Sequence, residues 1–399
     1  MADEVVIRAD SLGKNETRLE HIDMLRGCAA VLVMAGHLRS YVFTNFGSLS
    51  EPGIIVKLFY GITGLGHQAV IIFFAMSGFL VGGKALEQML SKRWYWPSYI
   101  LRRLSRLWIV IVPALLATFV LDQIGMALSG GFGYDGSLYN MYASGPNTDH
   151  PINYDISTFL GNLAFVQTIW VPIFGSNTPI WSLANEFWYY LIFPLAASLV
   201  LVQYRPQMRL LAATLLVASV FVLPWELLQA GAIWIAGAVA AWLGKQPRVA
   251  PVLRYTSIRL LSLALAATAV VLTKAPGGGG DLILGMAIAL WLPVIAMLPT
   301  CGKFYRLCAS GAADISYTLY LTHFPLLTLV IMIGFAPHRF PPSSTGAVVY
   351  LGLFILAIAW AMAFWWCFER HTDRLFHYVN ARLPLRAVGT RAPSAVSPI

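Results

Sequence analysis

Two ionisable side chains interrupt an apolar run near the beginning of the sequence. Arg26 and His37 are eleven residues apart, and on an α-helix this spacing puts both on one face, roughly 16 Å apart along the axis. If Arg26 marks a membrane edge, His37 lies near the middle of the bilayer. An ionisable group at that depth is costly, and imidazole titrates near neutral pH. The pair therefore indicates either a functional base or a histidine hydrogen-bonded between packed helices.

Further ionisable residues interrupt two later apolar runs. Glu186 is the only acid in the run that begins at Trp181, and His323 lies about halfway along another run, just before Pro325. A carboxylate inside a membrane helix either pairs with a buried base or orients a polar ligand. Pro325 should free the carbonyl of Leu321 and bend its helix there. Two mid-membrane histidines and a carboxylate exceed what a purely structural bundle requires.

Three arginines, Arg102, Arg103 and Arg106, precede a further apolar run in what we expect to be an inner loop. Arg103 and Arg106 are three residues apart and share one helix face. Paired guanidiniums suit a multiply phosphorylated ligand, because each can bind phosphate oxygens bidentately. The alternative is ordinary topogenic charge against anionic lipid.

Composition places these residues in a membrane protein. The 399 residues are 58% hydrophobic and 11% charged, with a mean hydropathy of +0.68. A soluble protein of this length is far less apolar, so the chain must span a bilayer. We predict an all-α, polytopic membrane helix bundle with about ten transmembrane helices, at 25–45, 62–83, 104–121, 180–202, 209–224, 227–244, 260–274, 282–299, 312–334 and 345–368. In the second of these, Ser77 and the glycines after it favour close helix packing over a direct role for Ser77.

The basic residues follow the positive-inside rule. With both termini cytoplasmic, all of the 27 Lys and Arg residues except Arg39, Lys57, Lys274 and Arg339 fall on the inner side. This distribution accounts for the net charge of +9 without a nucleic-acid partner. We therefore expect a protein integral to the plasma (cytoplasmic or inner) membrane.

The chain divides into three parts around these helices. We expect a cytoplasmic segment over 1–24, a transmembrane domain over 25–370, and a cytoplasmic, partly disordered tail over 371–399. An external loop at about 122–157 lacks Lys and Arg and is rich in Gly, Asn, Tyr and Asp, which suits either a neutral polyol or a solvated cap on the bundle. The apolar segment 158–174 is expected to be re-entrant or interfacial. The four cysteines have no paired spacing, so we predict buried or inert thiols and no metal site.

Five blocks of residues in this order resemble the acyltransferase-3 family of integral membrane acyltransferases, of the type that O-acetylates surface polysaccharides. They are the Arg26 to His37 spacing, the Ser-Gly-Phe block within 74–79, the Arg103 to Arg106 pair, the Ser182-Leu-x-x-Glu186 block and the block 317–325. The resemblance covers nearly the whole hydrophobic region. It implies acyl transfer from cytosolic acyl-CoA, commonly acetyl-CoA, to hydroxyl groups of surface glycans or of other secreted or small molecules.

Roles for the individual residues follow from this resemblance together with their chemistry. His37 and Arg26 match the family's essential pair, with His37 the expected base and Arg26 binding the donor or stabilising the thioester oxyanion. Glu186 is the third catalytic candidate. We expect acyl-CoA to bind at Arg102, Arg103 and Arg106, and one polar cavity to receive His37, Glu186 and His323. Further pocket candidates are Ser77, Ser182, Tyr317, Tyr320 and His323.

The acceptor class is the open part of this prediction. We expect a saccharide carried on lipid or on a polymer, and acylation of a small secondary metabolite would use the same helices. A proton-coupled transporter of acyl or sugar compounds is the rival from another class, since intramembrane His and Glu residues suit it equally. The cytoplasmic arginine pair and the lack of repeat symmetry favour the enzyme.

Overall fold

Helices form nearly all of the regular structure. The computed structural model describes residues 19–142, 144–148, 151–201, 204–274 and 278–382, and within these ranges β-structure is limited to isolated bridges. A bilayer offers no partners for backbone N–H and C=O groups, so helices that satisfy these groups internally are expected in so apolar a chain. The main helices are α2 (Glu20–Val42), α3 (Ile54–Thr63), α4 (Gly66–Ser77), the π-helix η2 (Gly78–Gly82), α5 (Gly83–Leu90), α6 (Trp96–Ser129), α7 (Tyr139–Tyr142), α8 (Ile156–Leu163), α9 (Trp181–Val200), α10 (Pro206–Val222), α11 (Trp225–Gly244), α12 (Thr256–Leu272), α13 (Gly278–Ala296), α14 (Lys303–Gly334), α15 (Ser344–Cys367) and α16 (Thr372–Arg382).

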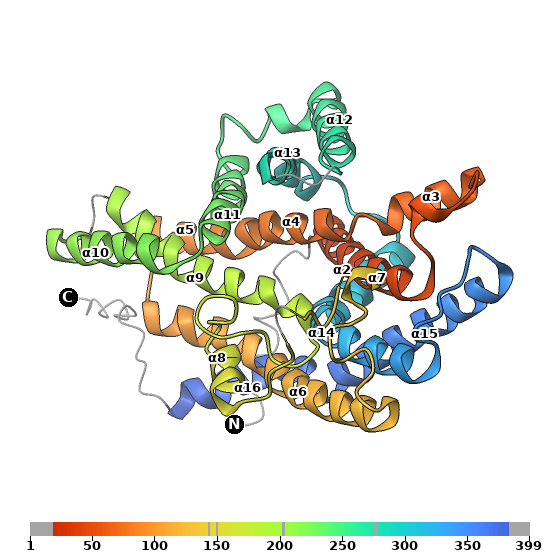
Figure 1. Ribbon diagram of the computed structural model, residues 1–399. Helices are drawn as coiled ribbons and strands as arrows, with labels where there is room; N and C mark the ends of the chain where they lie inside the picture. Colours follow the sequence, from red (N-terminus) through yellow and green to blue (C-terminus); the bar gives the residue numbers. More distant parts are fainter. Residues whose placement is uncertain (1–18, 143, 149–150, 202–203, 275–277, 383–399) are drawn as a thin grey trace, which may run out of the picture.

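Each of the ten predicted spans coincides with a helix in Figure 1. Among the described residues, six helical stretches are long and apolar enough to cross a membrane, and they contain α3 to α5, α6, α9, α11, α14 and α15. The shorter helices α10, α12 and α13 are also apolar, and α2 carries the charged residues of the first predicted span. The predicted all-α membrane helix bundle is therefore confirmed.

The inner end of α6 differs from the prediction. The helix begins at Trp96 with a proline in its first turn, where the missing N–H of proline costs nothing. Arg102, Arg103 and Arg106 therefore lie on the helix itself, and the predicted loop at this position is wrong. The helical face shared by Arg103 and Arg106 is retained.

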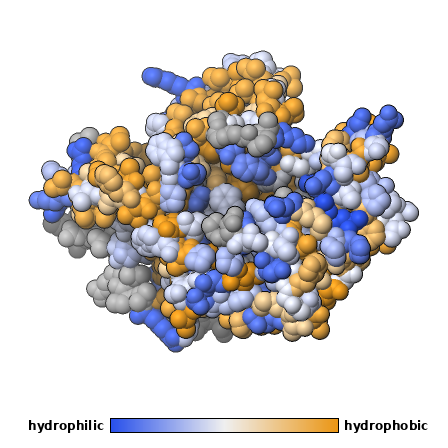
Figure 2. All heavy atoms as spheres, viewed as in Figure 1, coloured by the Kyte–Doolittle hydropathy of each residue, from blue (hydrophilic) through white to orange (hydrophobic). Residues whose placement is uncertain are grey.

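Large apolar side chains cover the outside of several helices. Figure 2 shows hydrophobic residues gathered over α10 and α12. Phe221 on α10 is 85% exposed and Leu272 on α12 is 71% exposed, and α15 carries similar residues. Contiguous apolar surface of this extent is unfavourable in water and matches the hydrocarbon region of a bilayer.

Helix α14 packs against α2, α6 and α15. At Gly27 of α2, an added Cβ would lie 2.4 Å from the Cβ of Ala312, so only glycine allows α2 and α14 to approach this closely. A second close approach occurs at Gly78, where an added Cβ would lie 1.9 Å from the carbonyl oxygen of Trp234 on α11. The close packing predicted for the glycines that follow Ser77 is therefore confirmed.

Two prolines inside helices each leave a backbone carbonyl without its helical hydrogen-bond donor, and a side chain from another segment donates to that carbonyl instead. Pro325 in α14 cannot donate to Leu321, and the amide of Asn177 donates to that carbonyl instead, at 2.9 Å. Pro194 in α9 leaves the carbonyl of Tyr190 in the same way, and the hydroxyl of Tyr99 donates to it at 3.1 Å. An unpaired buried carbonyl costs about 1–3 kcal/mol, so these contacts stabilise both bends.

The outer loop is attached to α6 through a buried carboxylate. Because α6 continues to Ser129, the first eight residues of the predicted loop 122–157 are helical. Asp122 accepts hydrogen bonds from the backbone N–H of Ser176 at 2.8 Å, from its hydroxyl at 2.6 Å and from Tyr154 at 3.1 Å. The segment 158–174 contains the end of the eight-residue α8 and then irregular structure, so it has no helix long enough to cross a bilayer.

The remaining expectations concern the chain ends and the thiols. Residues 1–18 of the predicted segment 1–24 and residues 383–399 of the predicted tail lie outside the described residues. In the described part of the tail, α16 packs against α6. All four cysteines are free and exposed, so the first alternative of the prediction, buried thiols, is wrong, and the second, inert thiols, stays a prediction.

Candidate active site

One cavity of the bundle, called the arginine cavity below, has a volume of about 250 Å³ and lies among α2, α4, α6, α9 and α14. Three guanidiniums and one carboxylate line it, together with hydroxyl groups and apolar side chains. One carboxylate offsets only part of the positive charge, so the cavity favours an anionic ligand. Its charged and hydroxyl-bearing residues are Arg26, Ser77, Arg103, Arg106, Ser182, Glu186, Tyr190, Ser316, Tyr317 and Tyr320.

Aromatic rings hold the two arginines of α6 in this cavity. The guanidinium carbon of Arg103 lies 5.8 Å from the ring centroids of both Tyr99 and Tyr190, and that of Arg106 lies 5.9 Å from the ring of Tyr317. Such cation–π contacts orient a guanidinium without using its N–H donors. The Nε of Arg103 is buried and has no hydrogen-bond partner among the described residues. The donors are therefore positioned for a ligand.

Arg102 points away from this cavity. Its guanidinium carbon lies 4.1 Å from the ring centroid of Phe376 in α16, and its side chain does not line the arginine cavity. A helix turns about 100° per residue, so Arg102 and Arg103 cannot face the same space. The structure therefore separates Arg102 from Arg103 and Arg106, the two arginines with which it was predicted to bind the donor.

Arg26 lies at the α14 side of the arginine cavity. Its Nη2 donates to the carbonyl of Ala313 at 3.3 Å and lies 3.4 Å from the carboxylate of Asp23. Its Nε is buried without a hydrogen-bond partner in the described part of the chain. The carboxylate of Glu369, in the turn after α15, attracts both Arg106 and Arg26. This half-buried acid partly balances the charge of these two arginines.

Glu186 is the centre of a hydrogen-bond network on the wall of the arginine cavity. Ser77 donates to its Oε1 at 2.9 Å, Tyr190 donates to the same oxygen, and the indole of Trp234 donates to Ser77 at 3.0 Å. Ser77 lines the arginine cavity and also contacts Trp234 of the closely packed helix α11. Hydroxyl donors hold the Glu186 carboxylate in a fixed orientation, which suits a residue that positions a ligand.

The second cavity, called the histidine cavity below, has a volume of about 420 Å³ and is lined from α2, α4, the outer loop and the beginning of α9. It contains imidazole, hydroxyl and indole groups, with one guanidinium. This mixture of polar and aromatic side chains suits a neutral, hydroxyl-rich ligand. Its polar and aromatic residues are His37, Arg39, Ser40, Thr63, His67, Tyr139, Ser144, Thr178, Trp181 and Tyr320.

The outer loop closes one side of the histidine cavity. Ser40 donates its hydroxyl hydrogen bond to the carbonyl of Tyr142 in α7, which joins the loop to α2. Burial raises the pKa of the Tyr142 phenol to about 12, so this hydroxyl stays protonated at physiological pH. Tyr139 and Ser144, on either side of Tyr142, line the cavity itself.

His37 and His323 meet between α2 and α14. The Nδ1 of His37 lies 3.0 Å from the Nε2 of His323, and the Nδ1 of His323 lies 2.7 Å from the carbonyl oxygen of Leu319. His37 lines the histidine cavity, whereas His323 is 0% exposed and lines neither cavity. Of these two histidines, only His37 can therefore contact a ligand in either cavity directly.

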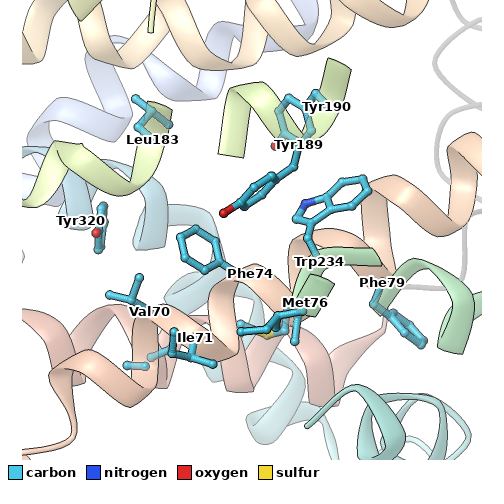
Figure 3. Close-up of a cluster of buried hydrophobic side chains, with 14 of the residues drawn as sticks. Val70, Ile71, Phe74, Met76, Phe79, Leu183, Tyr189, Tyr190, Trp234 and Tyr320 are labelled. Carbon is cyan, nitrogen blue, oxygen red and sulfur yellow. The ribbon is translucent and has the colours of Figure 1, made fainter. Parts of the chain in front are cut away.

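Val70 and Tyr320 line both cavities and form the wall between them. Figure 3 shows the two side chains, from α4 and α14, at the same end of the buried cluster. The Tyr320 hydroxyl donates to the carbonyl of Pro179 at 2.9 Å and lies 2.6 Å from the hydroxyl of Ser182. Because both cavities share these two side chains, they are adjacent at this wall.

The prediction of one cavity that receives His37, Glu186 and His323 is wrong. His37 lines the histidine cavity and Glu186 lines the arginine cavity, while His323 is buried behind His37. Arg26 and His37 share one face of α2 as predicted, but the three helical turns between them put them in different cavities. Among the other predicted residues, Ser77, Ser182, Tyr317 and Tyr320 line the arginine cavity.

Two residues were not predicted from the sequence: Tyr190, which lines the arginine cavity, and Glu369, which interacts with its arginines. Tyr190 follows Glu186 by one helical turn, and this i, i+4 spacing is a signal that could have identified it. Glu369 accepts hydrogen bonds from the backbone N–H of Thr318, at 3.2 Å, and from its hydroxyl. Nothing local in the sequence links Glu369 to the arginines of α6, since the contact depends on how α15 packs.

Comparison with known proteins identifies the family. The sequence model of the acyltransferase-3 family, described as an acyltransferase domain, matches residues 19–366. That range includes every predicted site residue, and it covers most of the chain. The chain therefore belongs to the acyltransferase-3 family, and its apolar helices are those of an integral membrane protein.

A curated relative is the protein named Acyltransferase MdmB from Streptomyces mycarofaciens, which is 30% identical over 184 residues. The aligned residues make up 45% of this chain and 39% of the relative. The chain thus matches about two-fifths of the length of that relative. No solved structure matches the chain.

Proposed function

We propose that the protein transfers an acyl group, typically acetyl, from cytosolic acyl-CoA to a hydroxyl of an exported or surface saccharide that is carried on lipid or on a polymer. The observation that carries this proposal is the pair of cavities that meet at Val70 and Tyr320. One is lined by three arginines, and the other is lined by the imidazoles of His37 and His67. An enzyme that joins a phosphorylated donor from one side of a membrane to an acceptor on the other requires two such compartments.

The arginine cavity supports an acyl-CoA donor. Arg103 and Arg106 carry donors suited to the phosphates of CoA, and the Nε atoms of Arg103 and Arg26 have no hydrogen-bond partner within the described residues. The apolar part of the wall suits the pantetheine arm and a short acyl group. In this arrangement the thioester extends toward the shared wall at Val70 and Tyr320, which is the part of the arginine cavity that borders the histidine cavity.

The histidine cavity supports a hydroxyl acceptor. Hydroxyl and amide-rich ligands bind well to sites that combine aromatic faces with hydrogen-bonding side chains, and Trp181 and Tyr139 provide the aromatic groups here. Ser40, Thr63 and Thr178 supply hydroxyls on the same walls. A saccharide is the acceptor class that this lining fits best.

In the proposed reaction, His37 acts as the general base. Its imidazole accepts the proton of the acceptor hydroxyl while that oxygen attacks the thioester carbonyl carbon. The carbon–sulfur bond then breaks, and the CoA thiolate receives the proton from the imidazolium, which gives an ester and free CoA-SH. The base is regenerated in one cycle without a second cofactor.

The other two catalytic candidates fit donor binding better than bond making. Arg26 is roughly 16 Å along α2 from His37, which is too far for one tetrahedral intermediate to contact both residues readily. We therefore assign Arg26 to donor binding and not to the oxyanion. Glu186, held by Ser77 and Tyr190, orients the donor and balances the arginines.

The proposal is tested by the ester content of the host's exported material. Surface polysaccharide and exported small molecules are isolated from three strains: with the gene, without it, and with the gene carrying His37→Gln. We expect alkali-labile acyl groups on the polysaccharide to be lost in the second and third strains. Loss confined to a small exported product would overturn the saccharide acceptor in favour of a small metabolite, and unchanged esters in both fractions would overturn the proposal.

A further inference from the structure

The hydrogen bonds of the histidine pair determine where its protons lie. The Nδ1 of His323 is 2.7 Å from the carbonyl oxygen of Leu319, and a carbonyl only accepts. His323 must therefore carry its hydrogen on Nδ1. A neutral imidazole has one N–H, so its Nε2 is left as an acceptor.

The same reasoning extends to His37. Its Nδ1 is 3.0 Å from the Nε2 of His323, which is an acceptor, so the His37 Nδ1 must donate. The neutral His37 ring then has its lone pair on Nε2. In the part of the chain that the structure describes, this Nε2 has no hydrogen-bond partner, and the residue lines the histidine cavity. The hydrogen bonds to His323 and Leu319 therefore determine that Nε2 is the nitrogen of His37 that can act as the base.

We propose that His323 is a positioning residue that holds His37 in the tautomer with its lone pair on Nε2 and accepts the Nδ1–H bond when His37 becomes positively charged. This inference rests on the proposed role of His37 as the base. His323 is fully buried and lines neither cavity, so it acts through His37 and does not touch the substrates.

The chemistry of the partner distinguishes this pair from a histidine oriented by a carboxylate. None of the carboxylates of the described residues forms an ion pair with His37. A neutral imidazole fixes the orientation and the tautomer but supplies no opposite charge. The edge of Phe324, 5.0 Å from the His37 ring centroid, adds an apolar contact. The imidazolium is therefore short-lived in this site, and its proton passes on to the CoA thiolate.

Three variants in the full-length protein test the inference. His323→Leu removes the acceptor and keeps an apolar side chain in place, whereas His323→Gln can present an amide oxygen to His37 Nδ1 and an amide N–H to Leu319. Thr322→Val is the matched control, because the buried hydroxyl of Thr322 donates to the carbonyl of Thr318 within α14 and has no other partner among the described residues. Turnover per folded molecule and the KM for acetyl-CoA are both measured. Host membranes are the source of the acceptor.

We expect His323→Leu to lower kcat about 10- to 100-fold with the KM for acetyl-CoA unchanged, as for other residues that orient a functional histidine. His323→Gln should recover most of that loss, and Thr322→Val should retain the parental kcat. Parental kcat in His323→Leu would overturn the inference, and so would equal losses in His323→Leu and His323→Gln.

A spectroscopic measurement on the unmutated protein keeps the test independent of folding in the variants. In ¹⁵N-histidine-labelled protein, the signals that disappear in His37→Gln belong to His37. We expect its Nδ1 to be protonated and its Nε2 to be unprotonated at neutral pH, and the reverse pattern would overturn the inference. Failure of the inference is distinguishable from failure of the proposed function: an inactive His37→Gln with a fully active His323→Leu removes only the role of His323, whereas an active His37→Gln removes the base itself.

Discussion

His37→Gln should lower turnover per folded molecule about 10²- to 10⁴-fold, the usual cost of removing a general base. Glutamine has a similar reach and can still hydrogen-bond to His323, so packing between α2 and α14 should survive. It lacks a nitrogen of useful basicity, so the acceptor hydroxyl would not lose its proton. Acyl-CoA binding should be unchanged, because the arginine cavity lies on the other side of the wall formed by Val70 and Tyr320.

The measurement is acyl transfer from labelled acetyl-CoA, normalised to folded protein from size-exclusion chromatography, with CoA binding measured alongside. If His37 were a structural histidine, the variant would instead lose folded protein and keep its turnover per molecule. Normal turnover would contradict the base assignment. Glu186 would then be the remaining ionisable candidate among the three predicted catalytic residues, since Arg26 is not a base at neutral pH.

Replacing both Arg103 and Arg106 with Gln should weaken acyl-CoA binding by about 100-fold or more. Hydrogen bonds to charged groups contribute about 1.5–3 kcal/mol each, and about 1.4 kcal/mol corresponds to a tenfold change in affinity. The matched control is Arg102→Gln, which removes a neighbouring arginine that faces Phe376 outside the cavity. It should leave the Kd for acyl-CoA near the parental value.

Binding is measured by calorimetry on the detergent-solubilised variants, with circular dichroism to verify their helical content. This check matters because Arg106 interacts electrostatically with the half-buried Glu369, whose charge would be less balanced in the variant. A folded double variant that binds acyl-CoA as tightly as the parent would show that the two arginines serve membrane topology alone.

Much of the helix arrangement could be predicted because a bilayer allows few solutions. Apolar runs of sufficient length must become helices, and each of the ten predicted runs is one. The spacing of residues in the sequence was equally informative for contacts and shared faces within a single helix. Arg103 and Arg106 share a face because they are three residues apart, and the carbonyl of Leu321 is freed because Pro325 follows it by four.

The residues that complete these local features could not be predicted, because they come from distant parts of the chain. Asn177, in the segment just before α9, satisfies the carbonyl of Leu321, and no periodicity links the two. Glu369 reaches Arg106 only through the packing of the last helices. The direction of Arg102 depends on where α6 begins, and that boundary was misplaced by about two turns.

The division into two cavities was missed for a related reason. A shared helical face puts Arg26 and His37 in line, but it does not tell whether the space beside them is continuous. Tyr320, from α14, and Val70, from α4, separate that space, and their positions follow from three-dimensional packing alone. Likewise, the burial of His323 behind His37 depends on the close approach of α2 and α14 at Gly27.

The most direct test of the account asks from which side the donor enters. Inside-out and right-side-out membrane vesicles from the host are given radiolabelled acetyl-CoA, which does not cross a membrane, and vesicles that contain His37→Gln give the background. We expect labelled, alkali-labile product in inside-out vesicles. In right-side-out vesicles we expect this product only after the vesicles are made permeable. Equal labelling of intact right-side-out vesicles would contradict a donor site that opens to the cytoplasm and an acceptor site that opens to the outside.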